Sequence, residues 1–155
     1  HMRERTLLSA PNINSYKRFV PGSFAPTTVA WGRDNRTCAV RLVGHGHSLR
    51  MENRVPGGDI NPYLTTAALV AAGIDGVERG LTLEEPLAGN AYAADMPKVP
   101  HTMDSALELW EHSDFARTAF GDEVVGHYAN MARVELESYG STVTDWELRR
   151  NFERF

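Results

Sequence analysis

The distribution of strand-forming and helix-forming residues changes near Asn61, and this change constrains the fold more than any other feature of the sequence. Before it, Gly and Pro separate short β-favouring runs over 27–31, 37–43 and 48–55. After it, helical patterns dominate. A block of strands followed by a block of helices predicts an α+β fold rather than an alternating α/β layout.

Charge and cysteine content narrow the class of protein. The 155 residues suit one domain, and 16 Lys and Arg against 20 Asp and Glu give a net charge of −4. This mild acidity argues against a nucleic-acid or anionic-membrane surface, which needs surplus positive charge. The single cysteine, Cys38, excludes an internal disulfide and fits a reducing compartment, so we expect a cytoplasmic protein. The longest apolar run, 64–74, is too short to span a membrane.

The start of the chain adds little to the fold prediction. His1-Met2 has the form of an expression-tag remnant, and we leave residues 1–2 out of the argument. No signal peptide follows, because Arg3-Glu4-Arg5 leads only to a short apolar stretch before Pro11. Residues 3–155 are consistent with a piece of a larger protein.

Two of the β-favouring runs predict a hairpin closed by the Gly-rich turn 44–47. Pairing Val43 with Ser48 puts four apolar side chains on one face, which we expect to be core. These four are Val40, Leu42, Leu49 and Met51. Because side chains alternate along a strand, the opposite face carries Arg41, Arg50, Glu52 and Arg54. Cys38 falls on the apolar face and is predicted to be a packed thiol.

The charged hairpin face has two explanations. It is either a solvated surface with ion pairs worth ~0–1 kcal/mol each, or a cluster of guanidiniums that binds phosphate or carboxylate groups. The basic segment 14–26 is likewise either a surface connection or an anion-binding approach whose loop 20–26 forms a lid. His45 and His47 are expected to be solvated turn residues rather than metal ligands.

The C-terminal half is expected to be helical scaffold. Asn61-Pro62 is a helix start, and the small apolar residues over 63–77 predict a buried helix. A long amphipathic helix is predicted from Asp122 to about Gly140. The caps of further helices are predicted at Asp104, Ser113 and Thr144. The tryptophans expected to anchor the core are Trp31, Trp110 and Trp146.

Five motifs occur in a fixed order along the chain: Asn14-Ser-Tyr-Lys-Arg-Phe-Val-Pro-Gly22, Arg33-Asp-Asn-Arg36, Arg41, Arg50-Met-Glu-Asn-Arg-Val-Pro56, and Asn61-Pro-Tyr-Leu64 with Ala67-Ala-Leu-Val-Ala-Ala-Gly-Ile-Asp-Gly76. Together they resemble the C-terminal part of the glutamine synthetase catalytic domain, over nearly the whole chain from about Asn12. The resemblance implies that residues 3–155 are a C-terminal fragment of that domain. We then expect antiparallel strands of the catalytic barrel followed by a helical half.

The resemblance also implies a role for each charged residue of these motifs. In that family ATP phosphorylates the γ-carboxylate of glutamate, and an amine displaces the phosphate. Arg18 would contact glutamate and the transferring phosphoryl group, Arg36 and Arg41 would bind ATP phosphates, Glu52 would be a ligand of Mg²⁺ or Mn²⁺, and Arg54 would hold the substrate. The hairpin geometry independently places Arg41, Glu52 and Arg54 on one face, whereas Arg36 would act from the strand's entrance.

The loop 20–26 departs from the family pattern. Its sequence Pro21-Gly-Ser-Phe-Ala-Pro26 has Phe24 where the family has a glutamate that helps to hold and deprotonate ammonium. The loop instead looks like that of the γ-glutamylamine branch, such as γ-glutamylpolyamine synthetases, whose acceptor is an organic amine. The resemblance further implies a ring-shaped homo-oligomer for the full-length enzyme, with ATP and Mg²⁺ as cofactors.

Two alternatives stay open at this point. The first is a true glutamine synthetase that uses ammonium, and Phe24 argues against it. The second is a non-catalytic structural or regulatory family member, against which the retained arginine cluster argues. We expect the fragment alone to be inactive, because a single carboxylate, Glu52, cannot hold two or more hard cations.

Overall fold

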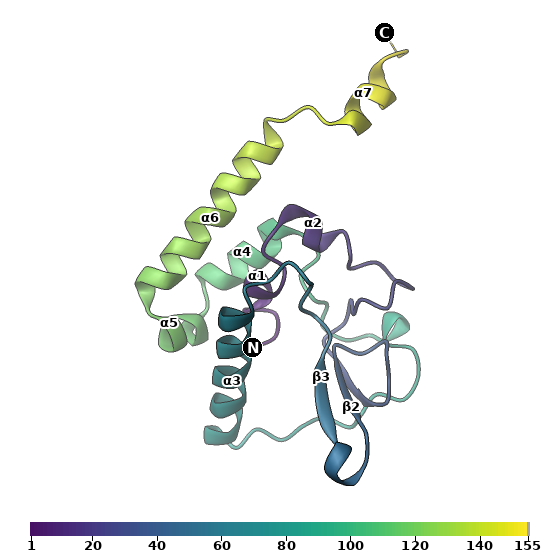
Figure 1. Ribbon diagram of the computed structural model, residues 1–155, viewed down its shortest axis with the longest axis vertical. Coiled ribbons are helices and arrows are strands. Elements are labelled where there is room, and N and C mark those ends of the chain that lie inside the picture. The colour runs from purple at the N-terminus through teal and green to yellow at the C-terminus, as the bar shows by residue number, and fades with distance from the viewer. Residues whose placement is uncertain (155) are drawn as a thin grey trace.

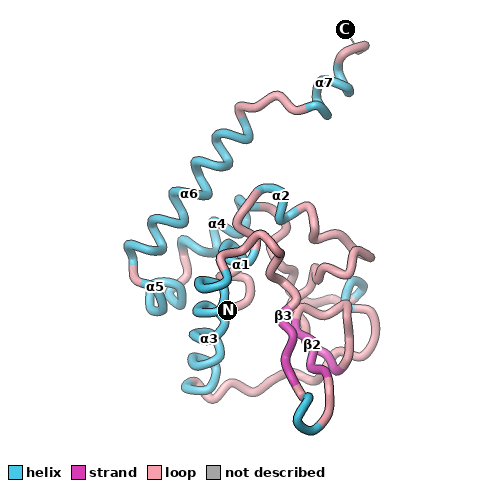
Figure 2. The backbone as a smooth tube through the Cα atoms, in the orientation of Figure 1, coloured by secondary structure: helices cyan, strands magenta, loops and turns pink. Residues whose placement is uncertain are grey.

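Strands occupy the first part of the chain and the longer helices the second. The structure is a computed structural model that describes residues 1–154 (Figure 1). Its helices are α1 (Thr6–Ser9), α2 (Ile13–Tyr16), α3 (Pro62–Glu78), α4 (Met103–Glu111), α5 (Asp114–Phe120), α6 (Asp122–Gly140) and α7 (Asp145–Asn151). Its strands are β1 (Trp31–Arg33), β2 (Val40–Val43) and β3 (Arg50–Asn53), and its 3₁₀ turns are η1 (Gly46–Ser48) and η2 (Ala91–Ala93). The α+β prediction is confirmed (Figure 2).

The three strands form one sheet in the order β1-β2-β3, with β1 parallel to β2 and β2 antiparallel to β3. The hairpin was predicted correctly, but its register was not: Val43 lies opposite Arg50, not Ser48. The turn η1 lengthens the connection between the strands. Because the shift is by two residues, every side chain keeps its predicted face, whereas a shift by one would have exchanged the faces.

The apolar face of the hairpin is not core, contrary to the prediction. Leu49 and Met51 are each 55% exposed, and Val40 and Leu42 are half-buried. The hairpin extends away from the helices (Figure 1), so its outer end has no apolar surface to pack on within residues 1–154. Cys38, at the entrance to β2, is fully buried, as predicted.

The main core lies where α1, α4 and α6 meet. Trp110 is fully buried, and its Nε1 donates to the Val125 carbonyl at 3.0 Å. Alanines of α4 and α6, including Ala106 and Ala129, are buried beside it and let the helices approach closely. Trp110 is the core anchor that was predicted, but Trp146 is 66% exposed on α7 and that prediction is wrong.

Helix α3 starts as predicted but is not buried. The Asn61 side chain accepts hydrogen bonds from the backbone N–H groups of Tyr63 and Leu64 and so caps the helix. Only Thr65 and Ala68 of α3 are buried. The helix is exposed elsewhere because, within residues 1–154, it packs on one side only, against α1 and α5.

The other predicted caps are partly confirmed. Ser113 caps α5 through Ala116 N, and Thr144 forms a capping box with Glu147 before α7. Asp104 is not a cap: Thr102 caps α4, and Asp104 lies in its first turn. The helix predicted from Asp122 to Gly140 is α6, which extends outward and leads to the exposed α7 (Figure 1).

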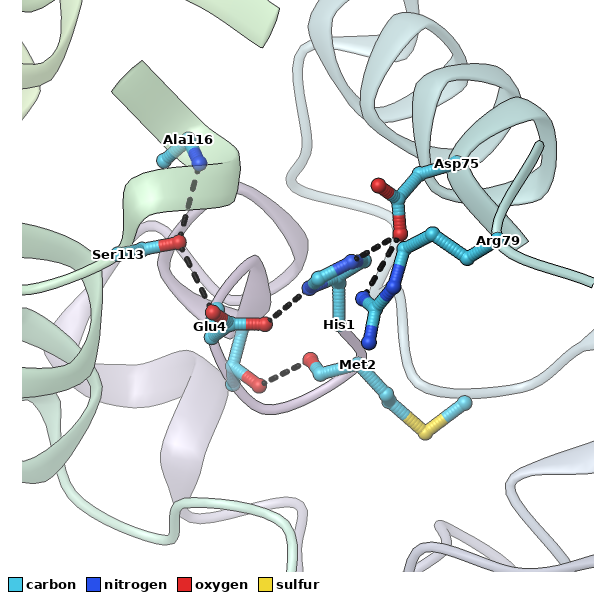
Figure 3. Close-up of polar contacts among 8 residues, drawn as sticks. His1, Met2, Glu4, Asp75, Arg79, Ser113 and Ala116 are labelled. Atoms are coloured by element: carbon cyan, nitrogen blue, oxygen red, sulfur yellow. Dashed lines mark hydrogen bonds and ion pairs between the residues drawn. The ribbon is translucent and has the colours of Figure 1, made fainter. Parts of the chain in front are cut away.

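The N-terminus, which we excluded from the prediction, contacts several elements. The His1 ring stacks on Phe115 with 4.0 Å between ring centroids. Its Nδ1 lies 2.5 Å from Glu4 Oε2, and its Nε2 lies 2.7 Å from Asp75 Oδ2 on α3 (Figure 3). His1 therefore joins the segment before α1 to α3 and α5. No helix within residues 1–154 combines the length and apolar character needed to cross a membrane.

Candidate functional site

The charged face of β2 and β3 brings three of the predicted site residues together. Arg41 lies directly opposite Glu52, and its Nη1 donates to Glu52 Oε2 at 3.0 Å. On the other side of the carboxylate, Arg54 Nε lies 3.4 Å from Glu52 Oε1. The hydrogen bond from Arg41 lowers the pKa of Glu52, and the charge of Arg54 adds to the effect. Glu52 is therefore an ionised carboxylate between two guanidiniums.

Arg54 has unused capacity to bind a ligand. Its side chain is 14% exposed, and its Nη1 is buried without a hydrogen-bond partner among the described residues. A buried guanidinium N–H without a partner costs free energy, because it has lost its hydration. An anion bound next to Arg54 would remove that cost.

Arg36 and Arg41 line one hollow at the start of β2. This hollow has a volume of about 610 Å³. It is lined by Arg33, Asp34, Asn35, Arg36, Arg41 and the segment Leu87-Ala88-Gly89. The Asn35 amide fixes the far wall by donating to Leu87 O at 3.1 Å and to Gly89 O at 2.8 Å. Arg36 thus lines the same hollow as Arg41 from the turn before β2. Alternation along a continuous strand would have put the two side chains on opposite faces.

Arg18 lies next to Arg54 rather than in this hollow. Its Nη2 donates to the Val55 carbonyl, and its guanidinium lies 5.0 Å from the centroid of the Phe19 ring. Burial lowers the pKa of Arg18, the nearby carboxylate of Asp59 opposes this change, and the positive charge of Arg54 adds to it. Arg18 and Arg54 therefore form the second positive part of the site, and Arg54 lies at the Glu52 oxygen that Arg41 does not contact.

Two acidic residues, Asp59 and Asp34, contact predicted site elements but were not themselves predicted as site residues. Asp59 Oδ2 accepts from Ser15 Oγ at 2.5 Å and from Asn12 Nδ2 at 3.1 Å, which ties α2 to the segment after β3. These bonds lower the pKa of Asp59, with Ser15 as the main cause. Asp34 contacts Arg41 directly. Asp34 stands inside a motif that we quoted, whereas nothing in the sequence links Asp59 to Ser15.

The loop 20–26 is fixed at its base and exposed at its tip. Ser23 Oγ donates to Val20 O at 2.6 Å, and Tyr92 OH donates to Ala25 O at 3.1 Å. Phe24 is 60% exposed and has a φ of 60°, a left-handed conformation that is costly for a bulky residue. The structure does not place its ring against the arginines: Arg18 lies over Phe19 instead.

The described part of the chain shows no complete metal site. Within residues 1–154, no group of three or more His, Cys, Asp or Glu side chains is arranged to hold a metal ion. His45 and His47 are exposed in the hairpin turn, as predicted. Glu52 can supply a single carboxylate to such a site.

Residues 1–151 match the family described as glutamine synthetase, catalytic domain. The chain is 68% identical over 99% of its length to "Gamma-glutamylethanolamide synthetase GlnA4" of Streptomyces coelicolor, and it covers 33% of that protein. It is 42% identical over 93% of its length to "Type-1 glutamine synthetase 2" of Dictyostelium discoideum, of which it covers 29%.

A solved structure, "GmaS/ADP complex-Conformation 1", matches 97% of the chain with a TM-score of 0.83 at 31% identity, and the chain covers 36% of it. The chain therefore spans about one third of the length of the relatives that it matches.

Proposed function

The chain belongs to the glutamine synthetase catalytic-domain family, and from that premise we propose that it is the C-terminal part of an ATP-dependent glutamate–amine ligase. Such a ligase forms γ-glutamyl phosphate and then transfers the glutamyl group to an amine. The observation that carries the proposal is the arrangement of Arg41, Glu52 and Arg54, in which one carboxylate lies between two guanidiniums and Arg54 Nη1 lacks a partner.

The two positive parts of the site suit the two anionic substrates. We assign Arg36 and Arg41, which line one hollow, to the ATP phosphates. We assign Arg18 and Arg54, whose positive charges act on each other, to glutamate and the phosphoryl group in transfer. Guanidiniums held in place before the reaction stabilise charge that develops on the phosphoryl oxygens, and this is usually the largest contribution to catalysis.

The residues present fit a nucleotide better than they fit a metal. Guanidiniums match phosphate oxygens bidentately, and one solved structure with a similar fold is a complex with ADP. Glu52 would supply one ligand to Mg²⁺ or Mn²⁺, and the other ligands would come from the rest of the protein. When bound, such an ion would neutralise charge on the phosphate oxygens.

We further propose that the acceptor is an organic amine, a polyamine or a smaller one. Phe24 offers an apolar surface and a cation–π face of ~0.5–2 kcal/mol toward an alkylammonium, and it cannot take a proton from ammonium. The 68% identical relative is named for the amide of ethanolamine, which places small alkanolamines first among the acceptors to test.

The isolated chain should fold without being a ligase. Its buried core supports folding, but it lacks the other metal ligands. We also propose that the full-length protein acts in the cytoplasm as a ring-shaped homo-oligomer. Glutamate-dependent phosphate release from the isolated chain would contradict the prediction that it is inactive.

The function is tested by phosphate release from the full-length protein with ATP, glutamate and a panel of amines. Release that depends on both glutamate and an organic amine supports the proposal. Glutamine synthetase remains the second candidate, because a glutamine synthetase is 42% identical to the chain. It would be correct if kcat/KM for ammonium exceeded that for every polyamine and alkanolamine.

A further inference from the structure

Asp34 lies in the hollow proposed for ATP phosphates, although its charge repels an anion. It follows β1 and precedes Asn35 and Arg36. Its backbone has a φ of 48°, a left-handed conformation that Asp, Asn and Gly tolerate better than other residues. Its N–H donates to Leu42 O at 2.9 Å, so the turn is fixed to β2. A strained turn that presents a carboxylate to an anion site requires a physical reason.

The carboxylate of Asp34 contacts one edge of the Arg41 guanidinium. Arg41 Nε donates to Asp34 Oδ1 at 3.0 Å, and Arg41 Nη2 contacts the same oxygen. Arg41 Nη1 donates to Glu52 Oε2 at 3.0 Å. A guanidinium has five N–H groups, so these contacts leave one N–H on each terminal nitrogen.

We propose that Asp34 is a positioning residue that fixes Arg41 so that its two remaining N–H groups meet the phosphates of a bound nucleotide. This inference rests on the proposed function, because it takes the hollow as the phosphate site. Asp34 and Glu52 hold the guanidinium from two sides, so turning its plane away from this orientation would break at least one of the two contacts. The guanidiniums of Arg33 and Arg36 line the same hollow and outweigh the one negative charge of Asp34.

Burial and charge agree with this role. The Arg41 side chain is 13% exposed and that of Asp34 is 73% exposed. The contacts with Asp34 and Glu52 raise the pKa of Arg41, and the contact with Arg41 lowers the pKa of Asp34. If the exposed Asp34 carboxylate served only to balance charge, holding it in one fixed geometry would add little free energy. The strained backbone of Asp34 instead fixes that geometry.

Two variants separate positioning from charge. Asp34→Asn and Asp34→Gly remove the same negative charge, and both residues tolerate the left-handed backbone. Asn keeps an oxygen that accepts from Arg41, whereas Gly has none. Asp122→Asn is the matched control, because Asp122 pairs with Arg117 at 2.6 Å outside the site.

The probe is inorganic triphosphate, titrated into the 155-residue chain by calorimetry. Hydrogen exchange of the Arg41 Nε–H is followed by ¹⁵N NMR, with the signal assigned by its loss in Arg41→Lys. Asp34→Gly should weaken triphosphate binding by about tenfold, the effect of losing a charged hydrogen bond, and should speed exchange of the Nε–H. Asp34→Asn should bind triphosphate at least as tightly as the unmodified chain, and Asp122→Asn should change neither value.

Several results would overturn the inference. Equal tightening by both Asp34 variants would show that Asp34 acts only through its charge. Two measurements on the unmodified chain would also exclude a positioning role for Asp34, and neither needs Asp34→Gly to fold. The first is an Arg41 Nε–H that exchanges as fast as the Nε–H of exposed Arg149. The second is a lack of triphosphate binding. If the full-length protein showed no ligase activity, the proposed function would be overturned, but the triphosphate binding of the Asp34 variants could still be compared.

Discussion

The core around Trp110 and the β2–β3 hairpin differ in the interactions that hold their side chains in place. Around Trp110, side chains from α1, α4 and α6 bury one another, and the indole N–H has its partner in Val125 O. In the hairpin, one face carries the contacts among Arg41, Glu52 and Arg54, and the other leaves Met51 more than half exposed. The core gains its free energy from burial, whereas the hairpin holds charges in place without burying an apolar face.

The two regions differ in whether residues 1–154 supply every partner that their side chains need. Buried apolar contacts need only this chain, because the helices that make them are all present. The guanidiniums have a counter-charge in Glu52 and Asp34, but Arg54 Nη1 has no partner within residues 1–154. Within residues 1–154 the core around Trp110 is therefore closed, whereas Arg54 keeps an N–H group that could bind a ligand.

The largest expected effect is on the stability of the core. Trp110→Ala removes a fully buried indole and its hydrogen bond, so the free energy of unfolding should fall by ~3–5 kcal/mol. Met51→Ala in the hairpin should cost less than about 1 kcal/mol, because half of that side chain is exposed. Urea unfolding of the chain measures both, and similar losses would show that the hairpin is as tightly packed as the core.

Removing charged side chains of the hairpin tests whether its charged face takes part in the reaction. Glu52→Ala and, separately, Arg54→Ala should each lower turnover of the full-length protein at least ~100-fold, the scale for one positioned electrostatic group. Arg149→Ala is the control, because Arg149 is an exposed arginine of α7 that lies outside this face and pairs with Asp145 at 3.3 Å. Near-normal turnover of Glu52→Ala at saturating Mg²⁺ would mean that the charged face is only a solvated surface.

The loop 20–26 gives a smaller effect that sharpens the assignment of the site. Phe24→Glu should raise kcat/KM for ammonium relative to an organic amine by about tenfold, because a carboxylate holds a small cation and can take its proton, whereas the ring offers ~0.5–2 kcal/mol to an alkylammonium. Phe24→Leu keeps an apolar side chain and serves as the control. An unchanged preference in Phe24→Glu would remove Phe24 from the acceptor site.

The smallest effect concerns acid stability at the junction of α2 and the segment after β3. The folded-state pKa of Asp59 lies below its unfolded value, so its contribution is complete above the unfolded pKa and is lost as the pH falls through that value toward the folded one. Asp59→Asn should flatten the decrease of the unfolding midpoint below about pH 4, where unfolded Asp titrates. Asp95→Asn, in an exposed loop, is the control, and an equal flattening there would exclude a special role for Asp59.

Predictions from local patterns agreed with the structure wherever one segment determines its own conformation. Helix α3 begins at the predicted Asn61 cap, and α6 has the predicted bounds, because capping and periodicity are properties of a few neighbouring residues. The shared face of Arg41, Glu52 and Arg54 also followed from strand alternation, and it survived the error in register because that error was an even number of residues.

Predictions of burial held for Trp110 and Cys38 but failed where no distant element covers the segment within residues 1–154. The apolar residues of α3 and Trp146 look like core residues in the sequence, but a side chain is buried only if another element covers it. The roles of Arg18, Arg36, Arg41, Glu52, Arg54 and Phe24 are predictions that the proposed variants can test.

The sequence by itself determined the order of strands and helices, the charged face of the hairpin and the membership of the family. Only the tertiary structure decided that Asp34 contacts Arg41, that Arg36 lines the same hollow as Arg41, and that Ser15 donates a hydrogen bond to Asp59. Periodicity and capping act over a few residues, so the sequence contains them directly. Contacts between distant side chains depend on how the whole chain closes, and no local pattern specifies that.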